Sequence, residues 1–328
     1  FLLFILSFPL SVKAEVTIDF STMDEEINLE PWLSYQKLIA YGKTHGSMSK
    51  NEEIWWLLRK AQTENLLYFY EDFDKTTTLA QSKVTKSTPK KISSLLNVYS
   101  GVVETQKGNF SQANVFFNKA LIQAKASNLP FVYIKGKQEL AYSRSLTELY
   151  EASLIEMQEA YVEAFSLNNE FLIAVINETY GAIYGYMAEY EKSIEYYEKA
   201  LKVYERLGYR AHIAEAIYGL ASTYRYWQKY DLAIENFELY RTKVSYTPTK
   251  EISYYAAYGL GMTLAEKGEC LRAIEVMDKA LSLHGMIDYD AELYKQKTHC
   301  SIVLGKLEQA KVSLDKAEEI FNNLPELM

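Results

Sequence analysis

The chain has 328 residues, of which 48% are hydrophobic, with 14 glycines, 6 prolines and a formal net charge of −8. Such a chain can bury a continuous elongated core, and no low-complexity linker divides it. The acidic balance and the lack of a basic stripe exclude a phosphate-binding surface, because affinity for nucleic acid rests on clustered lysine and arginine. We therefore expect no nucleic-acid partner.

The first residues, FLLFILSFPLSVKAEV, predict an export signal. An apolar run from Phe1 to Leu10 precedes the triplet VKA at 12–14, which is typical of a signal-peptidase site that cuts before Glu15. The run is too short to span a bilayer unaided. Because the chain begins with Phe rather than Met, we expect a fragment with a truncated signal peptide at 1–14 and a periplasmic location. The alternative is a short buried helix.

Residues 15–88 predict an N-terminal segment and a helical cap. The sequence SKNE at 49–52 is a capping box that opens a helix. Residues 31–86 carry no regular packing pattern, so we expect a degenerate cap that shields the regular region after it. Thr88 as N-cap and Pro89 at the first helical position then predict the start of that region.

From residue 89 to 328 small and large residues alternate in a fixed register with a period of forty residues and a last step of 37. The first small column is Ala113, Ser153, Ser193, Ala233, Ala273 and Ala310. A second column stands twelve residues before the first and consists of Gly101, Ala141, Gly181, Ala221, Gly261 and Thr298. A third column stands seven residues after the first and consists of Ala120, Ala160, Ala200, Tyr240, Ala280 and Ala317. The bulky column, four residues after the first, is Phe117, Met157, Tyr197, Phe237, Met277 and Leu314.

These spacings predict helix pairs. Residues three, four and seven apart share one face of a helix, so each unit contains a helix whose buried face carries both small and large side chains. Breaks such as TQKGN at 105–109 and EKGE at 266–269 divide each unit into two helices joined by a short turn. Such a pair cannot bury its apolar face alone, so about six units must stack into an array over 89–328.

The columns resemble the tetratricopeptide repeat family over roughly residues 94 to 320. The residues that match its pattern of small and aromatic positions are Gly181, Tyr184, Ser193, Tyr197 and Ala200, then Ala221, Tyr224, Ala233 and Phe237. The resemblance implies an all-α, right-handed α-solenoid. The usual period is about 34 residues, so a period of forty implies longer helices or turns between repeats. Other helical repeats with a period near forty are the alternative.

Catalytic patterns are absent from the sequence. The four histidines, His45, His212, His284 and His299, are scattered and form no HExxH motif, and no cysteines pair at metal-ligand spacing. No GxSxG turn or phosphate loop occurs, and the glycines of GLGMTLA at 259–265 fit helix packing. We expect no catalytic residue, no bound metal and no cofactor in this segment.

Two cysteines, Cys270 and Cys300, fall in the last two units. Cys270 opens a second helix and Cys300 lies late in the next first helix, and because successive helices run antiparallel these ends should be close. In an exported protein this favours a disulfide that joins the last two repeats. The alternative is two buried free thiols.

The first helix of each pair carries, besides the packing columns, a second stripe of side chains. In the tetratricopeptide family this stripe lines the concave face where ligands bind, so it predicts a binding groove. Its tyrosines are Tyr142, Tyr186, Tyr218, Tyr226, Tyr255 and Tyr258, and among them lie Lys135, Gln138, Glu178, Glu215 and Arg225. Aromatic rings give contact area at a small entropy cost. We expect a peptide, protein or small ligand with an anionic or aromatic group, oriented by Arg225. The alternatives are a groove filled by the chain's own terminus and rings that face solvent.

The order of export signal, helical array and unfinished C-terminus resembles the periplasmic sensory region of bacterial membrane-bound diguanylate cyclases. In those proteins a membrane helix and a cytoplasmic GGDEF domain follow the array. The resemblance implies a non-catalytic signal-transduction input, tethered to the inner membrane only through a segment absent from this chain, with a homodimer as one assembly to test. The alternative is an autonomous periplasmic adaptor that scaffolds protein complexes.

Overall fold

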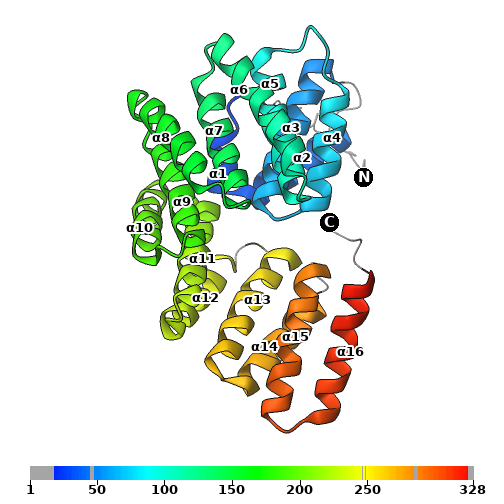
Figure 1. Ribbon diagram of the computed structural model, residues 1–328. Helices are drawn as coiled ribbons and strands as arrows, with labels where there is room; N and C mark the ends of the chain where they lie inside the picture. Colours follow the sequence, from blue (N-terminus) through cyan, green and yellow to red (C-terminus); the bar gives the residue numbers. More distant parts are fainter. Residues whose placement is uncertain (1–17, 45–47, 246, 248, 284–286, 324–328) are drawn as a thin grey trace, which may run out of the picture.

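The computed structural model describes residues 18–44, 48–245, 247, 249–283 and 287–323, so the expected export signal lies outside the described residues. Within these ranges the chain forms sixteen α-helices and no strand, and the helices follow one another in pairs (Figure 1). The predicted all-α, right-handed solenoid of tetratricopeptide-like helix pairs is confirmed. The helices are α1 (Asp24–Leu29), α2 (Pro31–Thr44), α3 (Lys50–Leu66), α4 (Tyr70–Ser82), α5 (Lys90–Gln106), α6 (Phe110–Ala126), α7 (Pro130–Ser145), α8 (Tyr150–Ser166), α9 (Glu170–Tyr186), α10 (Tyr190–Leu207), α11 (Arg210–Tyr226), α12 (Tyr230–Lys243), α13 (Lys250–Lys267), α14 (Cys270–Ser282), α15 (Ile287–Val303) and α16 (Leu307–Asn323).

The alternating columns form the helix interfaces. Every member of the first small column is buried. A Cβ added to Gly181 of α9 would lie 2.8 Å from Tyr197 Cδ2 of α10, and one added to Gly101 of α5 would lie 2.4 Å from Phe117 Cε1 of α6. At these distances any side chain at the glycine would overlap the ring. The ring therefore fills the space that the glycine leaves, and the two helices pack closely.

Two of the bulky rings, Tyr197 and Phe237, also reach the next repeat. A Cβ at Gly219 of α11 would lie 2.3 Å from Tyr197 Cε1, and one at Gly259 of α13 would lie 2.2 Å from Phe237 Cε1. Tyr197 is thus held between the first helix of its own repeat and that of the following one. This double contact explains why the pattern must repeat in register, since one ring positions two interfaces.

The turn inside each helix pair from α3–α4 to α15–α16 carries one residue with a positive φ at the same register position. These residues are Tyr68, Gly108, Glu148, Ala188, Gln228, Gly268 and Gly305. Glycine adopts this left-handed conformation without a steric penalty, whereas a residue with a Cβ is strained by about 1–2 kcal/mol. Four of the seven turns therefore hold a strained residue, and Tyr68, at φ 61°, has the bulkiest side chain among them.

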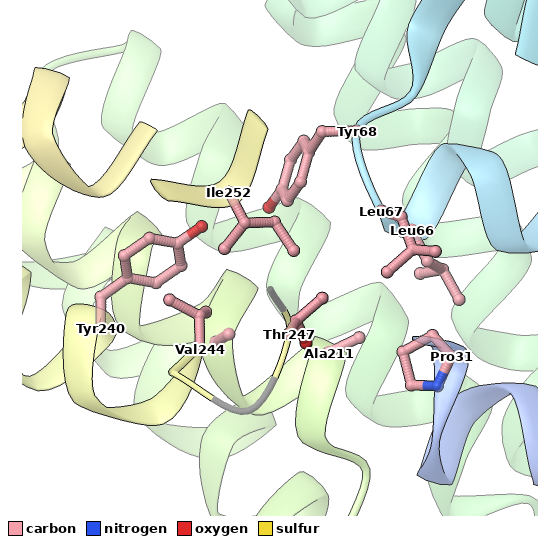
Figure 2. Close-up of a pocket in the computed structure, with 10 residues that line it drawn as sticks. Pro31, Leu66, Leu67, Tyr68, Ala211, Tyr240, Val244, Thr247 and Ile252 are labelled. Atoms are coloured by element: carbon pink, nitrogen blue, oxygen red, sulfur yellow. The ribbon is translucent and has the colours of Figure 1, made fainter. Parts of the chain in front are cut away.

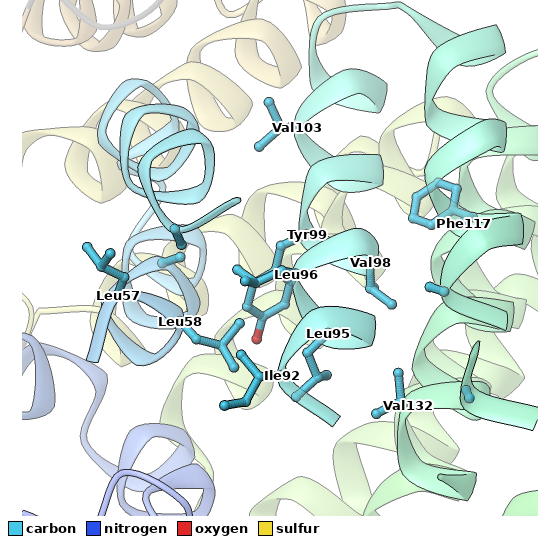
Figure 3. Close-up of a cluster of buried hydrophobic side chains, with 14 of the residues drawn as sticks. Leu57, Leu58, Ile92, Leu95, Leu96, Val98, Tyr99, Val103, Phe117 and Val132 are labelled. Carbon is cyan, nitrogen blue, oxygen red and sulfur yellow. The ribbon is translucent and has the colours of Figure 1, made fainter. Parts of the chain in front are cut away.

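Helices α3 and α4 continue the forty-residue register toward the N-terminus. Tyr70, which opens α4, lies forty residues before Phe110, which opens α6. One buried apolar cluster runs without interruption from Leu57 and Leu58 of α3 through α5 to Phe117 of α6 (Figure 3). The helix stack therefore has no break in its core at the expected boundary between residues 88 and 89.

The packing residues of α4 explain why its sequence does not show the pattern. Phe73 occupies the register position of the small residue Ala113, and Thr77 occupies that of the large residue Phe117. All four side chains are buried. The large and the small side chain have exchanged places in α4. The total volume of the pair is therefore kept, but the column pattern is not visible in the sequence.

The N-terminal helices curve back onto the middle of the array. Arg59 of α3 is 2% exposed, and its guanidinium donates hydrogen bonds to the carbonyl oxygen of Phe20 at 2.6 Å and to Asp24 Oδ2 at 2.7 Å, which fixes α1 on α3. Helix α1 packs against α11 as well as α2, and Glu30 lies 3.2 Å from Arg210. The stack is therefore bent into an open ring (Figure 1).

The far end of the described array is not covered in the same way. Leu314 of α16 is 45% exposed, whereas the other five residues of the bulky column are at most 8% exposed. No further first helix packs over α16 within the described residues. Among the described helices, none combines the length and the apolar character needed to cross a lipid bilayer.

Candidate functional site

Aromatic side chains from one turn and three first helices meet at Tyr255 of α13. The Tyr255 ring lies 5.0 Å from that of Tyr68 in the α3–α4 turn, 6.5 Å from that of Tyr218 on α11 and 5.9 Å from that of Tyr289 on α15. The Tyr258 ring lies 4.9 Å from that of Tyr289. We call these five residues the tyrosine cluster. It contains three of the tyrosines predicted for the groove and two that the sequence did not indicate.

The hydroxyl groups of Tyr68, Tyr218, Tyr255 and Tyr258 stay protonated at neutral pH, because burial raises the pKa of each above its ordinary value. Burial raises the pKa of Tyr255 well above its ordinary value, and the neighbouring Tyr289 raises it further. Burial likewise raises the pKa of Tyr258, although Arg225 opposes this effect. The cluster thus offers aromatic faces and neutral hydroxyl donors, the groups that orient a ligand in an apolar site.

The remaining predicted tyrosines lie outside the cluster. Tyr142 of α7 and Tyr186 of α9 contact each other, with ring centroids 6.4 Å apart and hydroxyl oxygens 3.4 Å apart. Tyr186 is 45% exposed and Tyr226, at the end of α11, is 59% exposed. The predicted stripe is therefore divided into a cluster, a pair and a single exposed ring.

Arg225 has a carboxylate neighbour inside the protein. Its guanidinium is 11% exposed, lies 4.7 Å above the Tyr226 ring, and has Nη1 3.4 Å from Glu266 Oε1 of α13. Burial raises the pKa of Glu266, and Arg225 partly offsets that rise. An anionic ligand at Arg225 would therefore share the guanidinium with Glu266, a residue that the sequence analysis did not connect with it.

Part of the concave side is filled by the chain itself. Leu67, at the start of the α3–α4 turn, is 1% exposed and packs with Ala214 of α11, Tyr240 of α12 and Ile252 of α13. Figure 2 shows Leu67 and Tyr68 pointing from this turn toward those helices. A groove filled by the chain's own terminus was one alternative from the sequence, and at this place an internal turn packs there instead.

An imidazole and two carboxylates form a second polar group on neighbouring first helices. His212 Nδ1 of α11 lies 3.4 Å from Glu215 Oε2 of the same helix and 3.9 Å from Glu178 Oε2 of α9. Tyr204 of α10 donates a hydrogen bond of 2.6 Å to Glu178 Oε2. Burial, followed by the charge of Glu215, holds the pKa of Glu178 well above its ordinary value. Three potential metal ligands thus converge at one partly buried place.

The two cysteines meet as predicted for neighbouring helix ends, and both are buried free thiols. Cys270 opens α14 and Cys300 lies on α15. Burial raises the pKa of Cys300 to about 12, and its hydrogen bond with the Cys270 thiol contributes. The disulfide stays a prediction, and the contact that it requires is present.

Besides Glu266 and Tyr204, the residues of these sites that were not assigned a role from the sequence include Tyr68, Tyr289 and His212. Tyr68 lies forty residues before Gly108, so continuing the turn register toward the N-terminus would have marked it. His212 was judged a scattered histidine because the four histidines form no HExxH motif. Its position three residues before Glu215 on one helix face was the available signal.

Comparisons with known proteins support the repeat fold. Residues 172–241 match the family described as tetratricopeptide repeat, and no curated protein matches the sequence significantly. A Rap protein complexed with competence and sporulation factor is 14% identical with a TM-score of 0.68, over 91% of this chain and 83% of that one. The apo form of RapI is 16% identical with a TM-score of 0.56, over 82% and 98%. Aspartyl phosphate phosphatase F from Bacillus subtilis is 12% identical with a TM-score of 0.55, over 94% and 96%. At these identities the likeness concerns the fold alone.

Proposed function

We propose that this tetratricopeptide-type solenoid is a non-catalytic binding module that holds a peptide, protein segment or small ligand with an anionic or aromatic group at the tyrosine cluster. The convergence of rings from separate repeats on Tyr255 carries the proposal. Rings provide contact area without a large loss of side-chain entropy, and protonated hydroxyls among them set orientation. A similar fold, that of a Rap protein, has been solved in complex with competence and sporulation factor.

The position of the cluster suits a sensor. Tyr68, Tyr218 and Tyr255 come from a turn and two helices that would move relative to one another if the open ring of stacked helices widened or narrowed. A ligand transmits a signal only if it favours one of two such states, because equal affinity for both shifts no population. We therefore propose that ligand binding changes the curvature of the array. Small shifts at each helix interface would add up along the stack to produce this change.

The finer part of the proposal is that the module is exported and forms the periplasmic input region of a membrane-bound diguanylate cyclase. It rests on the export pattern at 1–14 and on the resemblance in organisation. Two observations test it. Mature protein from the native cell should begin at Glu15, and the gene should continue beyond residue 328 with about 20 apolar residues and a GGDEF domain.

A ligand screen by thermal shift on the chain tests binding. A hit should raise the melting temperature of the wild type, and the shift should be lost in Tyr255→Ala and reduced in Arg225→Glu. Tyr161→Ala is the matched control, because Tyr161 stacks on Phe165 of its own helix α8, away from the cluster. A shift that survives both substitutions would place the ligand elsewhere. A hit that leaves the radius of gyration and self-association unchanged in scattering would contradict the signalling role.

The second candidate is an autonomous adaptor, and a row of exposed aliphatic side chains favours it. Val115 and Ile122 of α6 are 57% and 70% exposed, and forty residues later Ile155 and Val162 of α8 are 61% and 59% exposed. A row of this kind on adjacent second helices is typical of a surface for protein contact. Under the adaptor hypothesis, Ile122→Asp with Ile155→Asp abolishes co-purification of partners from the native cell, whereas Tyr255→Ala leaves it intact.

A further inference from the structure

We propose that Glu178, His212 and Glu215 bind one divalent transition-metal ion, with Zn²⁺ as the best fit. This site is separate from the tyrosine cluster, and the proposal does not depend on the function proposed above. It differs from the expectation drawn from the sequence, which included no metal. Three features of the molecule support this site: the positions of the three ligand atoms, the buried Nδ1 of His212 without a hydrogen-bond partner among the described residues, and the contacts that hold the ligands in place.

The ligand atoms lie close to the spacing that a tetrahedral ion requires. The three atoms all lie within 4.8 Å of one another, and two of the separations are 3.4 and 3.9 Å. Zinc bonds of about 2.0–2.2 Å at tetrahedral angles place neighbouring ligand atoms roughly 3.3–3.6 Å apart. The site therefore needs only small side-chain adjustments to accept the ion. His212 and Glu215 are one turn apart on α11, and Glu178 comes from the packed first helix α9, so both supports are rigid.

The imidazole lacks the partner that a purely structural histidine would have. The His212 side chain is 12% exposed, and no described residue meets hydrogen-bond geometry with its buried Nδ1. Buried polar atoms in proteins are almost always hydrogen-bonded, so an unsatisfied one needs an explanation. Nδ1 faces the two carboxylates, and an imidazole with its proton on Nε2 would present the Nδ1 lone pair to the space between them.

The two carboxylates gain from a cation between them. The Glu178 and Glu215 side chains are 20% and 29% exposed, and the carboxylates of both face Nδ1 of His212, at 3.9 and 3.4 Å. The lysine whose charge acts on Glu178 is Lys135, which has its own carboxylate partner, Glu139, at 3.4 Å. A divalent ion would satisfy both carboxylates and Nδ1 together, which a single ammonium group cannot do.

Neighbouring aromatic residues orient the ligands. Tyr204 donates its hydroxyl to Glu178 Oε2, and its ring stacks on His212 with centroids 4.9 Å apart. Phe171 packs edge-on against the His212 ring at 5.2 Å. Such outer contacts fix ligand geometry in metal sites. A site with one nitrogen and carboxylate oxygens suits Zn²⁺ or Co²⁺ better than Ca²⁺ or Mg²⁺, which prefer oxygen alone. Three protein ligands leave a coordination position for water.

Calorimetric titration of the chelator-treated full chain with zinc chloride tests the site. We expect one equivalent to bind, with His212→Ala and Glu178→Gln each weakening the affinity by at least about 100-fold and Tyr204→Phe weakening it by about 10-fold. Glu178→Gln keeps the size of the side chain, so it reports on ligation if His212→Ala fails to fold. Cobalt(II) should show the visible bands of a tetrahedral site and no thiolate charge-transfer band.

Two controls separate this site from other zinc ligands of the chain. His299 is exposed on α15, and Cys300 is the thiol of the last repeats, so His299→Ala and Cys300→Ser should bind zinc as the wild type does. Absence of zinc binding by the wild type would overturn the proposal. So would unchanged affinity in Glu178→Gln, or loss of binding in Cys300→Ser instead. Because no organic ligand enters this titration, its failure says nothing about the tyrosine cluster, and a failed ligand screen says nothing about the metal.

Discussion

Two kinds of contact hold this array together, and they differ in how they relate to the sequence. Tyr197 contacts Gly181 and Gly219, which belong to its own repeat and the next one, and forty residues later Phe237 contacts Gly259 of its next repeat in the same way. Tyr68 contacts Tyr255, which lies several repeats away, and this contact occurs once. Repeated contacts follow from a local register, whereas the single contact depends on the accumulated curvature of the whole stack. The predictions below compare the two.

The largest effect is expected at a repeated contact. Tyr197→Ala removes a ring that is 8% exposed and packed between two first helices, so the cavity should lower the free energy of unfolding by roughly 3–5 kcal/mol. Urea denaturation measures this. Tyr226→Ala is the control, because that ring is 59% exposed and should change stability little. Similar losses in the two variants would show that the assigned register is wrong.

The cysteine pair tests another contact between sequential repeats. If an oxidant in the compartment to which the protein is exported removes two hydrogens from Cys270 and Cys300, a disulfide forms. It should raise the free energy of unfolding by about 2–4 kcal/mol relative to Cys270→Ser. Intact-mass measurement under non-reducing conditions should then show a mass two hydrogens below that of the dithiol. Free alkylation of both thiols in native exported material would rule out the bridge.

Overpacking the glycine that faces Tyr197 should cost less than removing the ring. Gly181→Leu would place a side chain where a Cβ already lies 2.8 Å from Tyr197 Cδ2, so we expect a loss of about 1–3 kcal/mol. The double variant Gly181→Leu with Tyr197→Ala should recover part of this loss, since the leucine can then occupy the space of the ring. Purely additive free energies would indicate that the two residues do not share one space.

The contact between Tyr68 and Tyr255 can be removed together with the backbone strain at Tyr68. Tyr68→Gly relieves the left-handed conformation but loses the ring that packs on Tyr255, so we expect a net loss of about 1–2 kcal/mol. Small-angle scattering should also show a larger radius of gyration, because the α3–α4 turn no longer reaches α13. An unchanged radius with reduced stability would mean that the turn contact does not set the curvature.

The smallest effect, opposite in sign, comes from the equivalent turn of a later repeat. Ala188 has φ 59° and is exposed, so Ala188→Gly removes strain without removing a packed side chain. We expect the melting temperature to rise, corresponding to a gain of about 0.5–1 kcal/mol. Tyr68→Gly and Ala188→Gly make the same backbone change, so the difference between them measures the Tyr68 ring. Destabilisation by Ala188→Gly would show that the turn is not under strain.

The sequence predicted the repeated contacts because spacing along one helix determines which residues share a face. The packing of Tyr197 against the small residue Gly181 of its own pair could be inferred in this way, whereas its contact with Gly219 of the next repeat was not inferred. The sequence could not predict that Tyr68 meets Tyr255 or that Glu266 faces Arg225, because these pairs depend on the angles at which successive helices stack. The cap was recognised as helical, but the exchange of large and small at Phe73 and Thr77 concealed its register.

The contact between the α3–α4 turn and α13 also bears on how the chain folds. An array with only neighbouring contacts has a low contact order, and its pairs can form one after another from any starting point. Tyr68 and Tyr255 can meet only after the intervening helices α5 to α12 have stacked. Because loop-closure entropy rises only slowly with loop length, closing this long loop costs little more free energy than closing a shorter one. The closure must still wait until the intervening helices have stacked, so it is a late step. We expect refolding of the wild type to end in a slower phase that Tyr68→Gly lacks.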